Sequence, residues 1–265
     1  MKPGRETFTK EGLIQKLSEI ANMGFVPNGR HGNHGGVGNT LEDLLGIEEN
    51  NLPIPNAAEW ELKTHRAGSA SLVTLFHSEP SPRAVRFVPR VLLPLYGWPH
   101  QQAGMKYPAD EMSFRQTISG ATSSDRGFKV IIDRETRKVL ISFDALGVDP
   151  RHHLWLASVR ERVGLGQLDP QPYWGFDDLE HDAGAKLHNS FFVEADVRRN
   201  DGMELYHYAH AMMLSRFSLN RLLEGIEAGV VYVDFDARSG HNHGTKFRVR
   251  SDALPSLYEN EKKLF

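Results

Sequence analysis

The stretch AAEWELKTHR, residues 57–66, has the alternating pattern of a β-strand but carries opposite charges on one face. In a strand, Glu61 and Lys63 point to one side, while Trp60 and Leu62 point to the other. A lone E-x-K triplet is ordinarily a solvated ion pair on an exposed strand face. Whether this pair has a chemical role depends on the residues around the strand.

The composition is that of an ordinary globular protein. The chain has 265 residues, of which 40% are hydrophobic and 25% charged, enough for one compact unit of two lobes. No run approaches the roughly 18 apolar residues of a membrane span. The start MKPGRETFTKEG lacks the apolar centre of a signal peptide, so we expect a cytoplasmic protein without a membrane partner. The absence of cysteine excludes disulfides and thiolate metal sites, while a net charge of -3 leaves room for a local basic surface.

The first predicted element is an amphipathic helix, which Thr9 can cap and Gly24 can end. Its apolar residues recur at helical spacing: Leu13, Ile14, Leu17, Ile20 and Ala21. The glycine-rich stretch 26–40 is typical of a loop. A short helix over 40–47 follows, with Thr40 as its N-cap.

Alternating segments predict the strands of a sheet. These segments are 57–66, 71–76, 114–119, 128–133, 138–143, 191–198, 230–236 and 245–250. A further helix over 218–229 begins at Ser218. The segment 164–190 is rich in turn-forming residues and predicts a long irregular excursion. This order of elements indicates an α/β or α+β fold with a mixed central sheet.

Neighbouring residues make the E-x-K pair a candidate active site. Asn56 precedes the strand, and Glu42 lies on the short helix that glycines introduce. Downstream, SGHNHGTKFRVR, residues 239–250, carries two histidines among basic residues. Metal-dependent phosphodiester nucleases use the carboxylate of such a pair to hold a divalent cation and the lysine to orient the attacking water.

Several segments, taken in order, resemble one known family, the MvaI/BcnI-type restriction endonucleases. These are monomeric type II enzymes related in fold to the mismatch-repair nickase MutH. The segments that carry the resemblance are GVGNTLEDLLGI (36–47), NNLPIP (50–55), EWELKTHR (59–66), SLVTLFHSEPSPR (71–83) and ARSGHNHGTKFR (237–248). The resemblance therefore spans most of the chain.

The resemblance implies a restriction-endonuclease-like core of the PD-(D/E)xK type, in which helices flank a mixed central sheet. A second lobe would recognise DNA. The chain would then be a single two-lobed nuclease domain over 1–265. Its catalytic core would be centred on 9–145, and its recognition elements would lie largely in 150–250.

The resemblance also implies catalytic roles. Glu61 and Lys63 match the (D/E)-x-K pair, and Glu42 matches a supporting acid on a helix. Position 56 matches the first acid of the motif, where the family has aspartate and this chain has Asn56. Asn56, Glu61 and Glu42 would together hold Mg²⁺, or Mn²⁺ in its place.

Asn56 departs from the family pattern in charge. An asparagine carbonyl can occupy the place of a carboxylate oxygen, but it brings no negative charge to a hard cation. One explanation is an engineered change that traps a DNA complex, and this is the explanation we favour, because the swap keeps shape while removing charge. The other two are a natural enzyme in which Glu59 or another acid takes over, and a natural protein that binds without cutting.

The basic segment near the C-terminus is a candidate DNA-reading element, because arginine can grip guanine and imidazole can donate to base-edge acceptors. By the resemblance, its residues for base or phosphate contact are Arg238, His241, His243, Lys246 and Arg248. Two further groups belong to the expected DNA interface: Arg30, His31 and His34 in the glycine-rich loop, and His77, Arg83 and Arg86 after the second strand.

Other interpretations of these motifs are open or excluded. The segment 238–250 could be a solvated hairpin with its turn at SGHNHG. A zinc site at His241 and His243 lacks a third ligand in register, and the string H-N-H does not establish the nuclease class of that name. The loop 29–38 lacks the Gly-Lys-Ser/Thr ending of a phosphate-binding P-loop.

These features together predict a Mg²⁺-dependent type II restriction endonuclease that acts as a monomer on duplex DNA. By the resemblance its site is of the CC-N-GG type, and a cognate DNA methyltransferase would be its functional partner. Two alternatives remain. One is a MutH-like mismatch-repair nickase, which would need a partner for activity. The other is a sequence-specific DNA-binding protein that has lost cleavage.

Overall fold

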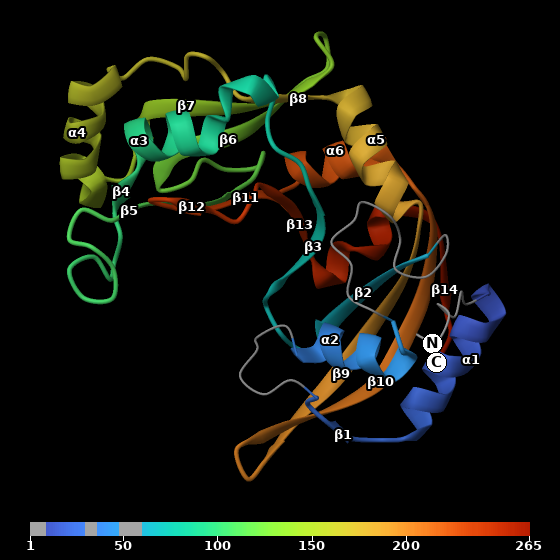
Figure 1. Cartoon of the computed structure of the whole chain (residues 1–265). Helices are drawn as coiled ribbons and strands as arrows, with labels where there is room; N and C mark the ends of the chain where they lie inside the picture. Colours follow the sequence, from blue (N-terminus) through green and yellow to red (C-terminus); the bar gives the residue numbers. More distant parts are fainter. Residues whose placement is uncertain (1–8, 30–35, 48–59) are drawn as a thin grey trace, which may run out of the picture. The chain divides into compact units, whose positions relative to one another are not determined.

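The computed structural model describes residues 9–29, 36–47 and 60–265. The chain forms two compact units, each assembled from separate stretches (Figure 1). Unit 1 comprises Met1–Val73, Ala183–Ser218 and Arg250–Phe265, whereas unit 2 comprises Thr74–Asp182 and Leu219–Val249. The expected division of roles between 9–145 and 150–250 stays a prediction. Among the described residues, no helix has the length and apolar character that a membrane crossing requires.

Unit 1 is built on a mixed five-stranded sheet, as the predicted fold class requires. Its strands are β1 (Val26–Pro27), β10 (Met203–Phe217), β9 (Asn189–Asn200) and β2 (Glu61–Arg66) in that order, with β14 (Tyr258–Lys263) also paired to β10. The strands β9 and β10 are antiparallel, but β2 runs parallel to β9. This parallel pair places Glu61 opposite Ser190 and Lys63 opposite Phe192.

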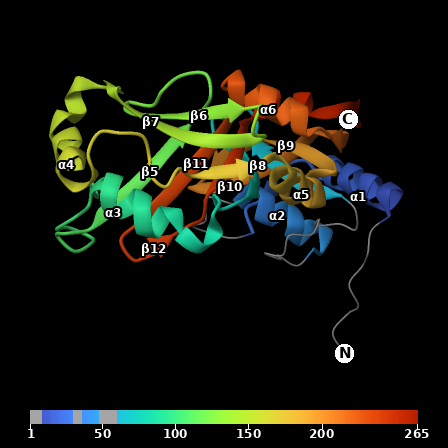
Figure 2. The ribbon, with the colours of Figure 1, turned by 90° about the horizontal axis from the view of Figure 1, so that it is seen from above.

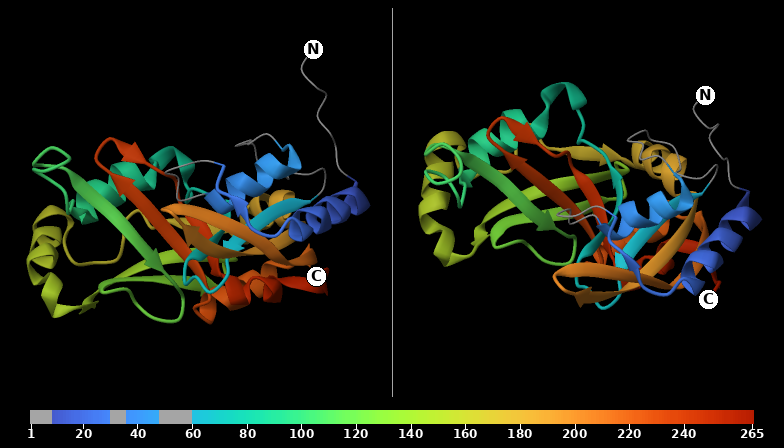
Figure 3. Two further views of the ribbon diagram at one scale, coloured as in Figure 1. Left: turned by 90° about the horizontal axis from the view of Figure 1, so that it is seen from below. Right: turned by 60° about the horizontal axis from the view of Figure 1, so that its bottom comes forward.

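Two helices pack on this sheet (Figure 3): α1 (Lys10–Asn22) lies against β10, and α2 (Gly36–Leu45) lies against β2. The predicted N-cap of α1 is confirmed, because Thr9 Oγ1 accepts a hydrogen bond from the Gly12 amide at 3.1 Å. Apolar side chains of both helices pack with one face of the sheet: Leu13, Leu17, Ile20, Val37, Leu41, Leu45, Trp60, Leu62, Phe191, Val193, Tyr206 and Tyr208. The opposite face of β2 therefore carries Glu61 and Lys63, as the alternation predicts.

The predicted start of α2 at Thr40 is wrong. The helix begins four residues earlier, at Gly36, and Thr40 is buried within it. A Cβ atom at Gly36 would lie 2.6 Å from the Tyr206 hydroxyl, and one at Gly38 would lie 3.0 Å from Thr64 Oγ1. The glycines that resemble a loop in the sequence thus let this helix approach the sheet closely.

Unit 2 contains most of a six-stranded sheet and a smaller three-stranded sheet. The larger has the order β3 (Leu72–His77), β13 (Lys246–Arg250), β11 (Val231–Arg238), β5 (Met112–Ile118) and β4 (Trp98–Pro99), with β12 (His241–Asn242) paired to β11. The smaller joins β6 (Arg126–Asp133), β7 (Lys138–Val148) and β8 (Tyr173–Gly175). Figure 2 shows β6 and β7 side by side. Each predicted strand in this part of the chain is confirmed.

The helices of unit 2 enclose an aromatic core. They are α3 (Leu93–Tyr96), which continues a π-helical turn over Val88–Leu92, α4 (His153–Val163) and α6 (Leu219–Glu227). Short 3₁₀ turns occupy Arg83–Val85 and Pro150–His152, and two more in unit 1 occupy Ser251–Ala253 and Pro255–Leu257. Phe128 has ring contacts with Tyr96, Phe114, Phe143 and Trp155, so these aromatic residues form one packed cluster.

The irregular excursion predicted for 164–190 is also corrected by the structure. It contains β8 and the helix α5 (Phe176–Leu187). Phe176, Leu179, Ala183 and Leu187 recur at helical spacing and are buried, while acidic residues occupy the first turn. The density of glycine and aspartate masked this periodicity. The elements α4, β10 and β14 were likewise not predicted.

Candidate active site

Glu61 and Lys63 form a buried ion pair on the polar face of β2. Their exposed fractions are 3% and 9%, and Lys63 Nζ donates to Glu61 Oε1 at 2.8 Å. Because both charges are removed from water, the solvated surface pair considered above is excluded. Burying two ions costs desolvation free energy that a single contact repays only in part, so the arrangement is weak as a purely structural device.

A second lysine, Lys186, approaches the same carboxylate. It lies in the last turn of α5, and its Nζ is 3.6 Å from Glu61 Oε1. A cation in the last turn of a helix is favoured by the helix dipole. The sequence placed this residue in an irregular loop, so its role was missed. The sequence feature that could have indicated Lys186 is its position just before β9, the strand that pairs with β2.

Glu61 Oε2 is the feature of the pair that fits a metal ion. This buried oxygen has no hydrogen-bond partner among the described residues. A buried carboxylate oxygen without a donor is costly, and an oxygen-seeking divalent cation would satisfy it. The described residues hold no group of three histidine, aspartate or glutamate side chains that could bind a metal by itself. Asn56 and Glu59 lie outside the described residues.

The surroundings of Lys63 lower its pKa below the usual value for lysine. Burial is the main cause that lowers the pKa of Lys63, and the positive charge of Lys186 lowers it further. The negative charges of Glu61 and Glu42 oppose this shift without reversing it. The charge of Glu42 on α2 therefore acts on Lys63, whereas the supporting role at a metal site that the family resemblance implies for Glu42 stays a prediction.

Two hydroxyl groups lie next to this pair, and the sequence did not indicate either. Ser190, which is opposite Glu61 in the sheet, has its Oγ 2.8 Å from the hydroxyl of Tyr258. Burial raises the pKa of Tyr258, and the charge of Glu61 raises it further. Tyr258 therefore stays protonated, and a neutral hydroxyl pair borders the carboxylate.

The expected DNA contacts divide by where they lie. Arg30, His31 and His34 fall outside the described residues, so their roles stay predictions. The remaining candidates are all in unit 2: His77, Arg83, Arg86, Arg238, His241, His243, Lys246 and Arg248. The Glu61–Lys63 pair therefore belongs to unit 1, whereas the described DNA-contact candidates belong to unit 2.

The histidines gather at the end of the β11–β12 hairpin, whose turn lies at SGHNHG as considered above. The rings of His241 and His243 are exposed and meet edge to face, with their centroids 4.2 Å apart. His77 lies beside the following residue, because a Cβ atom at Gly244 would be 3.4 Å from its ring. No third ligand for zinc occurs here among the described residues.

The basic residues of this segment are paired with acids from outside it. Arg238 donates to Glu111 at 2.9 Å, and its guanidinium stacks 4.6 Å from the ring centroid of Tyr107. Lys246 lies 3.8 Å from Asp236, and Arg248 donates to Asp234 at 3.2 Å. These carboxylates reduce the local positive charge around the segment, but they also hold its basic side chains in defined positions.

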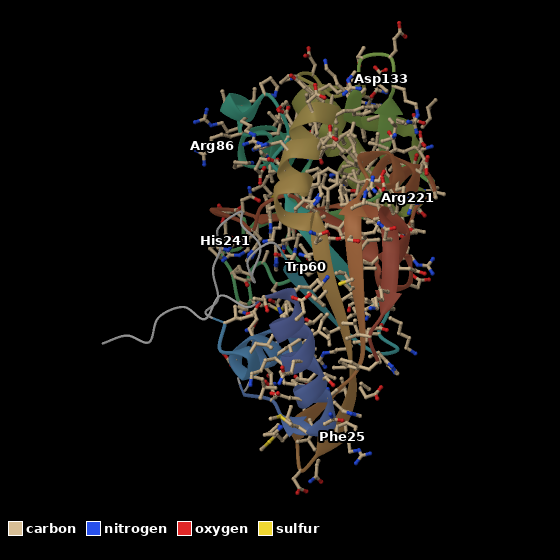
Figure 4. The ribbon with its side chains drawn as sticks, turned by 90° about the vertical axis from the view of Figure 1, so that its right-hand side faces the viewer. Phe25, Trp60, Arg86, Asp133, Arg221 and His241 are labelled. Carbon is tan, nitrogen blue, oxygen red and sulfur yellow. The ribbon has the colours of Figure 1, made fainter. Side chains whose placement is uncertain are left out.

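Arg83 begins the 3₁₀ turn Arg83–Val85, which lies a few residues beyond β3, and Arg86 follows the turn. Arg83 donates to Asp182 at 3.2 Å, and the Ser78 hydroxyl donates to the same carboxylate at 2.7 Å. Arg86 is exposed and has a left-handed backbone with φ of 55°. Figure 4 shows Arg86 and His241 on the same side of unit 2.

Comparisons with known proteins show the family and the fold of the chain. The family model of the MvaI/BcnI restriction endonucleases matches residues 14–258. The solved "Restriction endonuclease MvaI-cognate DNA substrate complex" is 25% identical, with a TM-score of 0.77 over 97% of this chain and 100% of that chain. "Restriction endonuclease MvaI in the absence of DNA" is also 25% identical, with a TM-score of 0.55 over 100% of both chains. A search of curated proteins returned no match. The chain has the restriction-endonuclease-like fold and belongs to the MvaI/BcnI restriction endonuclease family.

Proposed function

We propose that this chain is a type II restriction endonuclease that hydrolyses duplex DNA as a monomer, one strand at a time, at a short CC-N-GG type site. The observation that carries the proposal is the buried Glu61–Lys63 pair, in which one carboxylate oxygen has no hydrogen-bond partner within the described part of the chain. Membership of the family supports it. So does the structural likeness to a relative whose structure was solved with its cognate DNA.

Glu61 is the main candidate to hold a divalent cation, because its Oε2 is buried and no described residue donates a hydrogen bond to it. Glu42 and the side chain at position 56 would complete the site. When bound, Mg²⁺ would polarise the scissile phosphate and favour ionisation of a water molecule. Carboxylate oxygens suit this hard ion, which fits the donor set.

Lys63 has the geometry and the lowered pKa of a residue that handles the nucleophile. Its contact with Glu61 fixes Nζ, so the amine orients the attacking water toward phosphorus. Burial lowers the pKa of Lys63, which favours a role in taking up a proton from that water.

Lys186 supplies a second positive charge at the same carboxylate. It is more exposed than Lys63 and lies 3.6 Å from Glu61. An ammonium fixed in a partly buried site stabilises the extra negative charge of the pentavalent transition state. We infer that Lys63 orients water while Lys186 offsets charge.

Asn56 predicts weak cleavage by the chain as written. It removes one anionic ligand from the site that Glu61 and Glu42 would share, and Mg²⁺ prefers anionic oxygens. We therefore infer that Asn56→Asp restores full activity. Because a restriction endonuclease must spare the DNA of its own cell, we also infer a cognate methyltransferase as functional partner. We infer a cytoplasmic location as well, where the enzyme would meet incoming DNA.

The test is cleavage of a random duplex library in Mg²⁺ and in Mn²⁺ by the chain as written and by Asn56→Asp, with the products sequenced. Cleavage at CC-N-GG by the Asp form alone supports the proposal and assigns Asn56 as inactivating. Equal cleavage by both forms indicates that another acid, such as Glu59, fills the site. Cleavage without any added protein contradicts a partner-dependent nickase. Binding without cleavage by either form would replace the nuclease proposal with a sequence-specific DNA-binding protein.

A further inference from the structure

The six-stranded sheet of unit 2 has one apolar and one charged face. Along β11, Val233, Phe235 and Ala237 are in the core. Asp234, Asp236 and Arg238 alternate with them and so lie on the opposite face. Their neighbours on the flanking strands are Arg115 and Thr117 of β5 and Lys246 and Arg248 of β13.

Each aspartate of β11 joins the two flanking strands. Asp236 lies 2.6 Å from Nε of Arg115 and 3.8 Å from Nζ of Lys246. Asp234 accepts hydrogen bonds from Thr117 at 2.7 Å and from Arg248 at 3.2 Å. Asp234 and Asp236 thus hold the basic side chains of this face in position.

Arg115 differs from Arg238 and Arg248 in which guanidinium nitrogen faces its carboxylate partner. Arg238 and Arg248 both engage the terminal nitrogen Nη1 with carboxylates. In Arg115 the nitrogen nearest to its acid is the inner Nε, and no hydrogen bond within the described residues engages its terminal nitrogens. Its side chain is 55% exposed, so its outer fork is open to a ligand.

This geometry matches the major-groove edge of guanine. Guanine presents O6 and N7 as adjacent acceptors, and the two terminal nitrogens of arginine contact both at once. A carboxylate at Nε fixes the plane of the guanidinium group before DNA binds. Less side-chain conformational entropy is then lost on binding. Arg115 is also close to Arg238, because Arg238 on β11 pairs with Ser113 on β5, and Ser113 precedes Arg115 by two residues.

We propose that Arg115 reads one guanine of the recognition sequence and that Asp236 positions it. This inference rests on the proposed function. Among residues considered for DNA contact from the sequence, Arg115 was absent, because nothing in its local sequence pairs it with Asp236. The strand register, which places these residues opposite each other, provides that pairing.

An exposed arginine beside an acid is common, so a matched control is needed. Arg134 and Arg137 engage terminal nitrogens with Glu227 and Asp177. Arg216 is the closer match, since its Nε lies 2.7 Å from Glu259. However, Glu259 is 44% exposed and forms an ion pair with Arg216, whereas Asp236 is 22% exposed and contacts Lys246 as a second cation.

The experiment combines protein variants with base analogues. The parent is the chain as written, which we expect to bind with little cleavage, and the probe is the duplex selected by the library above. Each guanine in turn is replaced by 7-deazaguanine, which lacks N7 but keeps Watson–Crick pairing, and binding is followed by fluorescence anisotropy in Ca²⁺. For the parent we expect a loss of about 10-fold at one guanine or more, as for one contact of a bidentate pair.

Arg115→Ala should weaken binding to the unmodified duplex and show no further loss at one of those guanines. Arg115→Lys keeps the charge but not the fork, so it should also lose that response even if the alanine variant folds poorly. Asp236→Asn should reduce the response, and Arg216→Ala should keep it in full.

The inference is overturned if Arg115→Ala and Arg115→Lys keep the response at every guanine. It is also overturned if Arg115→Ala weakens binding equally on all sequences and lowers the salt slope by about one, the signature of a phosphate contact. Failure of the parent to bind any duplex would instead overturn the proposed function, and this inference with it.

Discussion

Lys186 Nζ lies 3.6 Å from Glu61 Oε1, the oxygen that Lys63 also contacts. Two ammonium groups thus face one oxygen of a buried carboxylate, while its other oxygen has no partner among the described residues. In this carboxylate, Oε1 contacts the two lysines, while Oε2 has the surroundings that fit a metal ion.

Replacing Lys186 by methionine should slow cleavage without unfolding the protein. If Lys186 offsets transition-state charge, Lys186→Met in the Asn56→Asp background should lower the single-turnover rate about 10- to 100-fold. Lys186→Arg, which keeps the charge, should retain most of the rate. DNA affinity measured in Ca²⁺ should change far less than the rate. Equal losses in affinity and rate would show that Lys186 acts in binding instead.

Breaking the buried pair from one side should destabilise unit 1. Lys63→Met leaves Glu61 with only the longer contact to Lys186, and loss of one partner of a buried pair costs about 3 kcal/mol. The double variant Glu61→Gln with Lys63→Met removes both charges, so it should recover much of that loss in urea unfolding. A single variant as stable as the parent would contradict the buried-charge argument.

A second ion pair in unit 1 predicts acid sensitivity. Hydrogen bonds from Arg66 and Tyr206 lower the pKa of Glu204 from 4.5 to about 2. Because the folded pKa lies below the unfolded one, this stabilisation is present above about pH 4.5. It is lost as the pH falls toward about 2. Glu204→Gln should show a shallower fall in unfolding free energy over this range than the parent, and parallel curves would contradict the assignment.

The close approach of α2 to the sheet can be tested with two glycines. A Cβ atom at Gly36 would lie 2.6 Å from the Tyr206 hydroxyl, whereas one at Gly184 in α5 meets nothing within 4 Å. Gly36→Ala should therefore lower stability by about 1–3 kcal/mol, as overpacking does. Gly184→Ala should raise it by about 0.5–1 kcal/mol through helix propensity. Thermal denaturation checks both signs, and stabilisation by Gly36→Ala would refute the packing argument.

Local patterns predicted the parts of the structure that depend on neighbouring residues. Alternation placed Glu61 and Lys63 on one face of β2, and the hydroxyl of Thr9 indicated the start of α1. The fold class and the family followed from short segments such as EWELKTHR taken in order.

Features that depend on distant residues were not predictable in this way. Lys186 reaches Glu61 only because β9 runs beside β2, a pairing across more than a hundred residues. Glu111 and Asp236 similarly meet Arg238 and Arg115 through strand register. The early start of α2 was hidden because Gly36 is selected there by contact with Tyr206, and glycine otherwise indicates a loop.

The parallel pairing of β2 with β9 also has a consequence for synthesis of the chain. A ribosome that has released Glu61 and Lys63 must still make residues 74–182, most of unit 2, before Lys186 and β9 emerge. Such long-range pairing is slow to form and late in translation. A nascent or truncated chain ending before β9 would therefore lack both the strand that pairs with β2 and the contact between Lys186 and Glu61.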